Sequence, residues 1–185
     1  MARVVDRQRA EAALREFLLA LGHDEDSLQQ TPARVTAAFA DELLCGYSVD
    51  VPELIAAGSE PCEGSVDPVM VDGINASTVC PHHLLVATGQ AMVAYEPGTR
   101  IVGLGTLAHL VDAFSRRLTL QEAIAGQVVD AIMRHAGAKG AFCRLALNHA
   151  CLQARGAQQP RAETVTWAGR GTMSKGLPIR TSCTC

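Results

Sequence analysis

The sequence predicts an α+β fold in which helices pack on one face of an antiparallel sheet. The first third of the 185-residue chain has the apolar spacing of helices, whereas short β-compatible runs begin near residue 69. Two further helical patterns interrupt these runs. The predicted order is helices, then strands, then a pair of helices and then more strands. This order is typical of α+β domains with helices on one side of the sheet.

Two longer helices are expected in the N-terminal region. In residues 6–21, which Gly22 ends, an i, i+3, i+4, i+7 spacing forms one apolar stripe from Leu14, Phe17, Leu18 and Leu21. Thr31 is expected to cap a second helix, with Pro32 at its first helical position and Gly46 after its end. These residues therefore predict a helical region before the sheet begins.

A third, short helix is predicted at 52–57, followed by a linker at 58–68 that is rich in Gly, Pro and acidic residues. Residues 72–75 read as a turn, and Gly89 as a break between two strands. The β-compatible runs lie at 69–71, 84–88, 91–95, 144–153 and 164–167.

The two later helices are indicated by apolar spacing at 107–118 and 124–133. Thr119 and Glu122 have the spacing of a capping box at the start of the second one, in which each side chain bonds the other's backbone N–H. Residues 169–185 show no clear periodicity. We expect them to form a C-terminal tail that is disordered or lies on a partner subunit.

Composition excludes several classes of protein. Hydrophobic residues make up 48% of the chain, enough for one domain with its own core. The formal net charge of −3 argues against a nucleic-acid partner. Apolar runs fall short of the roughly 20 residues of a membrane span, and the charges in 1–22 argue against a signal peptide, so a cytoplasmic protein is expected. Seven cysteines in a reducing compartment favour thiol or metal chemistry over disulfides.

Two short clusters combine the residue types that bind zinc. Cys80-Pro81-His82-His83 follows the predicted turn, and His149-Ala150-Cys151 lies in the strand-like run 144–153. Thiolate and imidazole are preferred zinc donors. Because side chains alternate along a strand, His149 and Cys151 are expected on the same face.

Joined together, the clusters suggest a zinc site formed by Cys80, His83 and Cys151, with His82 and His149 beside it as proton carriers. Three protein ligands leave a fourth position for water, which is typical of catalytic zinc; the ion lowers the pKa of that water from about 15.7 to about 7. In the alternative interpretation, the cysteines are buried apolar residues and the histidines are loop residues with satisfied hydrogen bonds. Spacing alone leaves both interpretations open.

Several separated motifs occur together in the order and spacing of one known family. They are Thr31-Pro32-x-Arg34-Val35, Cys80-x-His82-His83, Val102-Gly103-Leu104, Ser115-Arg116-Arg117-Leu118-x-x-Gln121-Glu122, His149-x-Cys151-x-x-x-Arg155-Gly156 and Thr164-Val165-Thr166. With these motifs the chain resembles GTP cyclohydrolase I from about residue 11 to residue 166. The resemblance favours the zinc interpretation.

This resemblance implies a tunnelling fold: an antiparallel sheet with two helices on one face, plus an N-terminal helical region. It divides the chain into helices at 1–58, a catalytic domain at 59–168 and a tail at 169–185. It also implies a toroidal homodecamer of two pentamers with active sites between subunits. The implied partner is a small purine substrate.

The implied chemistry is hydrolysis of a purine ring. Cys80, His83 and Cys151 would hold Zn²⁺, and a zinc-activated water would attack C8 of guanine. His149 would protonate the imidazole nitrogen, and His82 would transfer protons as the ring and the ribose open. Formate would leave, and the ribose carbons would close a dihydropterin.

The same resemblance implies four substrate-binding residues. Glu122 would accept hydrogen bonds from guanine N1 and the exocyclic amine, with Gln121 beside it. The capping box is the alternative role of Glu122. Arg34 and Arg155 match positions that contact phosphate.

The chain departs from the family where a triphosphate would bind. Family members typically read Gly-Leu-Ser-Lys, with an Arg three residues further on, whereas this chain has Gly103-Leu104-Gly105-Thr106 and then His109. Two permanent cations and a hydroxyl are therefore absent, and Pro81 replaces a Glu between the metal-site residues. A triphosphate is normally bound by Lys and Arg.

Three functions fit this pattern. The first is a GTP cyclohydrolase I with rearranged phosphate contacts. The second is a paralogous zinc hydrolase acting on a guanine-type nucleotide with fewer phosphates, a nucleoside or a base. The third is an inactive binding or regulatory relative, against which the intact set of metal and proton-carrying residues argues. Outside this set, Cys143 is expected in the core, and Cys183 and Cys185 as free thiols.

Overall fold

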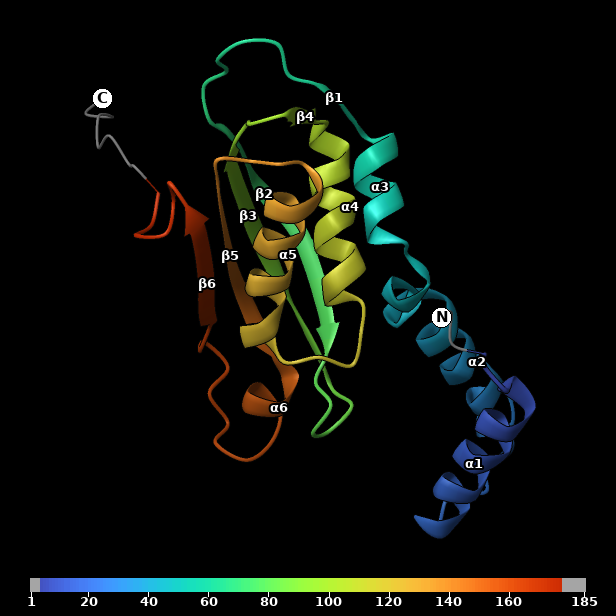
Figure 1. Cartoon of the computed structure of the whole chain (residues 1–185). Helices are drawn as coiled ribbons and strands as arrows, with labels where there is room; N and C mark the ends of the chain where they lie inside the picture. Colours follow the sequence, from blue (N-terminus) through green and yellow to red (C-terminus); the bar gives the residue numbers. More distant parts are fainter. Residues whose placement is uncertain (1–3, 178–185) are drawn as a thin grey trace.

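The computed structural model describes residues 4–177 and contains a four-stranded antiparallel sheet in the order β2-β3-β5-β6 (Figure 1). Two helices, α4 (Leu104–Ser115) and α5 (Gln121–His135), cover one face of this sheet. The predicted α+β arrangement is therefore confirmed. The strands of the sheet are β2 (Val69–Val79), β3 (Val86–Glu96), β5 (Gly140–His149) and β6 (Thr164–Gly171).

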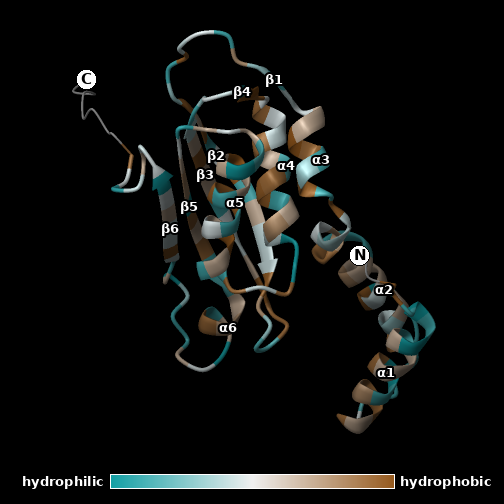
Figure 2. Cartoon of the chain, in the orientation of Figure 1, coloured by the Kyte–Doolittle hydropathy of each residue, from teal (hydrophilic) through white to brown (hydrophobic). Residues whose placement is uncertain are grey.

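The hydrophobic core lies between the sheet and these two helices. Leu110 of α4 and Ile124 of α5 are fully buried together with Val93 of β3 and Leu145 of β5. Figure 2 shows hydrophobic positions along both helices and along the strands behind them. Cys143 belongs to the same core, as predicted, and burial raises the pKa of its thiol to about 12. A thiol with this pKa stays protonated, so Cys143 is a packing residue.

Two strands are longer than the sequence predicts. β2 continues through 72–75, where a turn is predicted, because Gly73 takes a positive φ of 71° and a bulge absorbs the irregularity between Val71 and Ile74. β3 likewise continues through Gly89. A side chain at Gly89 would collide with the backbone of β5, so this glycine allows a close approach of two strands and does not break one.

The strand predicted at 144–153 is wrong beyond His149. β5 ends at His149, opposite Ala87 of β3, and the chain then turns into the short helix α6 (Ala150–Gln153). Its backbone is held by a hydrogen bond from the N–H of Ala154 to the carbonyl of Ala150, at 2.9 Å. Cys151 therefore reaches the site from α6, and it does not share a strand face with His149.

The first helix, α1 (Arg7–Ala20), confirms the helix predicted at 6–21. Asp6 caps it by accepting a hydrogen bond from the backbone N–H of Arg9 at 3.0 Å. None of the residues of α1 is buried, and Phe17 of its apolar stripe is 59% exposed. The helix packs on α2, so Leu14 and Leu18 of the stripe are half-buried, whereas its other residues stay exposed.

The second predicted helix divides into three pieces. Thr31 is the first helical residue of α2 and does not cap it: Gln30 is in the cap position with helical φ and ψ, and no side chain bonds there. Asp50 caps the third helix by accepting a hydrogen bond from the N–H of Glu53 at 3.1 Å. The elements of this region are η1 (Asp26–Leu28), α2 (Thr31–Ala37), the π-helix η2 (Ala38–Leu43), η3 (Cys45–Ser48) and α3 (Val51–Ala57).

The predicted capping box at Thr119 is wrong. Leu120 is the N-cap residue of α5 and makes no side-chain cap, while the Thr119 hydroxyl donates to the carbonyl of Leu120 at 3.4 Å. The helix begins later than the spacing suggests, so Thr119 lies outside it. The Glu122 carboxylate in the first turn therefore has no partner in a capping box.

Two short strands and a buried methionine complete the fold. β1 (Ser59–Pro61) pairs with β4 (Arg100–Val102), so part of the predicted linker is strand. β6 enters the segment assigned to the tail, and Met173 beyond it is buried against Ala94 and Phe142. The two terminal cysteines, Cys183 and Cys185, lie outside the described residues. Among helices of residues 4–177, none has the length and apolar character needed to cross a membrane.

Candidate metal and substrate site

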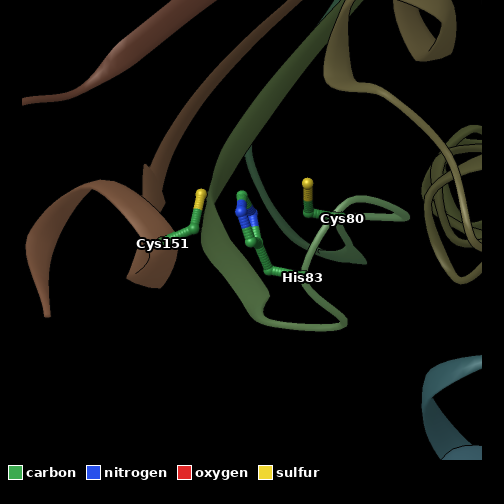
Figure 3. A group of neighbouring side chains, drawn as sticks. All are labelled: Cys80, His83 and Cys151. Atoms are coloured by element: carbon green, nitrogen blue, oxygen red, sulfur yellow. The ribbon is translucent and has the colours of Figure 1, made fainter. Parts of the chain in front are cut away.

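Three side chains from two separate segments gather at one end of the sheet. Cys80 follows the last residue of β2, His83 lies three residues later, and Cys151 lies in α6 (Figure 3). Their ligand atoms, two Sγ atoms and one imidazole nitrogen, all lie within 4.8 Å of one another. Zn–S bonds of about 2.3 Å and Zn–N bonds of 2.0–2.1 Å separate tetrahedral ligand atoms by roughly 3.5–3.8 Å. The cluster is therefore compact enough to hold one metal ion.

A tight turn aims the first two of these residues at the same point. The carbonyl of Cys80 accepts from the N–H of Leu84 at 2.9 Å, and the N–H of Cys80 donates to the carbonyl of Leu85 at 3.0 Å. Leu84 completes the turn with a positive φ of 56°, which is unusual for a residue with a β-carbon. Cys80 is buried and His83 is exposed, so the cluster is covered by protein at Cys80 and reaches solvent at His83.

The predicted proton carriers occupy different surroundings. His149, the last residue of β5, is half-buried, and its Nε2 lies 2.7 Å from Oε1 of Gln121. His82 is exposed, and its ring meets that of His83 edge to face, with centroids 6.3 Å apart. One histidine thus makes a part-buried hydrogen bond, whereas the other is exposed.

A cavity of about 250 Å³ joins these groups. Glu122 lies at its edge in the first turn of α5, where the helix dipole favours a carboxylate. Sequence reasoning assigned no site role to five of its residues: Thr78, Thr119, Leu120, Leu152 and Thr164. Of these, Thr164 belongs to a family motif, whereas neither spacing nor residue type marks Thr78 or Leu152. The cavity is lined by Thr78, Cys80, His82, Thr119, Leu120, Gln121, Glu122, His149, Cys151, Leu152 and Thr164.

The structure brings one of the two predicted phosphate-binding arginines to the site. Arg155 places Nη1 at 2.9 Å from Nε2 of His83. Arg34 lies on α2, donates to Gln30 at 2.8 Å, and does not line the cavity. Thr106 donates from its hydroxyl to the carbonyl of Gly58 at 3.2 Å, which is a contact within the fold.

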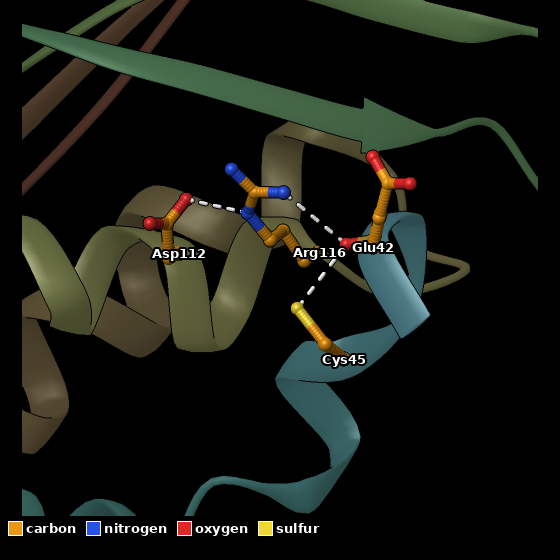
Figure 4. A network of polar contacts seen from close by, with 4 residues as sticks. All are labelled: Glu42, Cys45, Asp112 and Arg116. Atoms are coloured by element: carbon orange, nitrogen blue, oxygen red, sulfur yellow. Dashed lines mark hydrogen bonds and ion pairs between the residues drawn. The ribbon is translucent and has the colours of Figure 1, made fainter. Parts of the chain in front are cut away.

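Arg116 and Arg117, which directly follow α4, connect it with the N-terminal helices. Figure 4 shows the contacts of Arg116. Nε of Arg116 lies 2.9 Å from Asp112, which raises the pKa of the guanidinium, and Nη1 donates to the carbonyl of Glu42 at 3.2 Å. Cys45 donates from Sγ to the same carbonyl at 3.1 Å. Arg117 donates to the carbonyl of Gly46 at 3.0 Å. These contacts fix the helical region against the half of the chain that contains the sheet.

Known proteins resemble this chain over most of its length. The family model described as GTP cyclohydrolase I matches residues 10–184. The chain is 41% identical over 163 residues to GTP cyclohydrolase 1 of Deinococcus radiodurans, covering 87% of this chain and 74% of that protein. It is 38% identical over 180 residues to GTP cyclohydrolase 1 of Thermobifida fusca, and this match covers 95% of this chain and 86% of that protein. The solved structure of the archaeosine synthase QueF-Like in the apo form is 17% identical in sequence, and the match covers 62% of this chain and 100% of that one. Its TM-score of 0.46 is too low to establish a shared fold.

Proposed function

Because the chain belongs to the GTP cyclohydrolase I family, we propose that it is a zinc-dependent hydrolase that opens the imidazole ring of a guanine nucleotide. The reaction would be water attack at C8, release of formate and closure of a dihydropterin. The observation that carries the proposal is the cluster of Cys80, His83 and Cys151 beside a cavity that also contains two histidines and a carboxylate.

The donor set fits zinc. Two thiolates and one imidazole are soft and borderline ligands, and three protein ligands leave one position open for water. When bound, Zn²⁺ supplies the activation of a water molecule near neutral pH. Cys80 and Cys151 both line the cavity, so a metal ion held by them would lie beside the space that a substrate can occupy.

Glu122 is proposed to recognise the guanine base. A carboxylate can accept two parallel N–H donors, and guanine N1 and its exocyclic amine present such a pair. Since the capping box does not form, the Glu122 carboxylate is available for this contact.

His149 and His82 are proposed to move protons on either side of the cavity. His149 would protonate the imidazole nitrogen of the base as the ring opens, because its half-buried ring is held in one orientation. His82 would serve the later steps, in which protons are exchanged with solvent, since its ring is exposed. An imidazole can act in both directions near neutral pH.

The phosphate contacts favour a second candidate substrate class. Thr106 and His109 stand where the family has Lys and Arg, and Thr106 is already bonded to Gly58. Arg155 contacts His83 of the cluster, whereas Arg34 bonds Gln30 and does not line the cavity. A guanine-type nucleotide with fewer phosphates, a nucleoside or a base is therefore the alternative to GTP. An inactive binding relative is the lesser alternative, which the complete set of reactive side chains disfavours.

The proposed assembly is a homodecamer of two pentamers with active sites between subunits. The exposed apolar stripe of α1 supports it, since Leu21 as well as Phe17 stays exposed in the single chain. The proposed catalytic unit is residues 59–168, with the helical region 1–58 extending to a neighbour. A cytoplasmic location remains a prediction from the sequence.

The experiment is a substrate panel with product identification. The zinc-loaded protein would be incubated with GTP, GMP, guanosine and guanine, and products would be identified by mass spectrometry. Ring opening of GTP with dihydroneopterin triphosphate as product supports the first function. Efficient turnover of a less phosphorylated substrate supports the second, and no turnover of any of the four contradicts both.

A further inference from the structure

The Gln121 side chain makes three hydrogen bonds, all of them within the fold. Its Nε2 donates to the carbonyl of Thr164 at 2.8 Å and to that of Leu145 at 3.4 Å, and its Oε1 lies 2.7 Å from Nε2 of His149. The residue is only 2% exposed. An amide group offers two N–H donors, and both are used, so Gln121 has no donor left for a substrate.

These contacts fix which way the amide points. The two backbone carbonyls can only accept, so they require the NH₂ group to face them. Turning the amide over would place Oε1 against two carbonyl oxygens and leave buried acceptors without donors, which is unfavourable. The orientation therefore follows from the main chain around Gln121 and does not depend on His149.

The fixed amide in turn determines the tautomer of His149. Oε1 of Gln121 can only accept, so Nε2 of His149 must carry the hydrogen in their 2.7 Å contact. In the neutral ring Nδ1 is then the unprotonated nitrogen. Among residues 4–177, Nδ1 has no hydrogen-bond partner, and His149 lines the cavity.

We infer that Gln121 is a positioning residue that holds His149 as the Nε2–H tautomer, so that protons pass between His149 and the substrate through Nδ1. The proton step rests on the proposed function. In that step, the imidazolium form gives its Nδ1 proton to the imidazole nitrogen of the base. The electron pair of the broken N–H bond stays on Nδ1, and the ring returns to the neutral Nε2–H tautomer.

This role differs from the base contact that resemblance implies for Gln121. Adjacent residues on a helix point about 100° apart, so Gln121 and Glu122 need not face the same ligand. Gln121 is buried whereas Glu122 is exposed, and both border the cavity. Glu122 would therefore bind the base, and Gln121 would act on the substrate only through His149.

Nitrogen NMR of the zinc-loaded protein tests the tautomer directly. The six histidines would be labelled with ¹⁵N, and the His149 resonances identified by their loss in His149→Asn. The expected result is a protonated Nε2 and an unprotonated Nδ1 in the neutral ring. A neutral His149 with its hydrogen on Nδ1 would overturn the inference. This result needs no variant of Gln121. It also does not depend on whether the protein turns over a guanine substrate, so it can be told apart from a failure of the proposed function.

Two variants of Gln121 then separate positioning from binding. Gln121→Leu removes the acceptor, and we expect a mixed tautomer with KM little changed. The kcat should fall by about 10- to 100-fold, comparable with the loss of the outer hydrogen-bond partner of a metal-binding histidine. Gln121→Glu has only acceptors, so His149 must still donate from Nε2 and the Nε2–H tautomer should be kept, whereas the lost donors to the carbonyls of Thr164 and Leu145 should lower the melting temperature. A raised KM with the tautomer intact in Gln121→Leu would instead make Gln121 a substrate contact and contradict the inference.

Discussion

Arg155 donates a hydrogen bond from Nη1 to Nε2 of His83 over 2.9 Å, in contact with a residue of the proposed metal site. A guanidinium has only donors, so Nε2 of His83 must offer its lone pair. A neutral imidazole that binds a metal has one nitrogen on the ion and a hydrogen on the other. Neither nitrogen can then accept from Arg155, so metal binding and this hydrogen bond exclude each other.

Removing this competition should strengthen metal binding. Arg155→Ala is expected to raise zinc affinity by about 2- to 5-fold, since an exposed hydrogen bond contributes only about 0.5–1 kcal/mol. Competition with a chromophoric chelator measures the affinity. Arg161→Ala is the matched control, because it removes a nearby exposed arginine that has no contact with His83. Unchanged or weaker affinity in Arg155→Ala would refute the exclusion.

Glu122 should determine affinity for the base. Glu122→Gln replaces an accepting oxygen with an NH₂ group that opposes a guanine N–H, and hydrogen bonds to charged groups are worth about 1.5–3 kcal/mol. We therefore expect kcat/KM to fall by roughly 10- to 100-fold, with little change in melting temperature, because Glu122 caps no helix.

Steady-state kinetics and thermal unfolding check this expectation, and Glu63→Gln in an exposed loop is the control. A large loss of stability with normal kinetics would show that Glu122 supports α5 and not the substrate.

The altered phosphate segment predicts a gain of function. His109 is exposed on α4, and among residues 4–177 it makes no hydrogen bond or ion pair, so His109→Arg disturbs no contact in the single chain. If it faces the triphosphate in the assembly, the new guanidinium should lower the KM for GTP by about 2- to 10-fold. The KM for guanosine should stay the same. An equal effect on both substrates, or none on GTP, would place His109 away from the phosphates.

The contact between α1 and η2 should depend on pH. Hydrogen bonding to Arg7 lowers the pKa of Asp41 below its ordinary value of 3.8. Because the pKa of Asp41 is lower in the folded state, the contact with Arg7 stabilises the fold fully above pH 3.8. This stabilisation is lost as the pH falls through the folded-state pKa of Asp41.

Amide exchange in α1, corrected for its intrinsic pH dependence, should therefore lose protection below this pH in the wild type. In Asp41→Asn the protection should already be low and should stay flat across the range. The same pH dependence in Asp41→Asn would show that another group holds α1.

Much of the fold follows from patterns within single segments. Cys143, Leu145 and Leu147 alternate along β5 because one face of the strand meets the helices, and that alternation is visible in the sequence. The strand does not continue to Cys151, because pairing with β3 ends at His149. Pairing partners lie far away in the chain, so spacing alone could not locate this end.

The candidate site was predictable in its residue types but not in its contacts. Cys80, His83 and Cys151 were found from donor chemistry and resemblance, and the structure brings them together. The contact of Gln121 with His149 joins residues 28 positions apart on a helix and a strand, so it depends on how α5 packs on β5. Likewise the capping box failed because α5 begins after Leu120, which the tertiary packing decides.

The most direct measurement is formate release from GTP before and after metal removal. The protein, purified without added zinc, should contain about one zinc ion per chain and release formate. A chelator should abolish the release, and added zinc should restore it in the wild type and in Cys62→Ser but not in Cys151→Ala, which lacks one of the three ligands. Formate release that survives metal removal, or that persists in Cys151→Ala, would contradict the zinc-dependent function proposed for this chain.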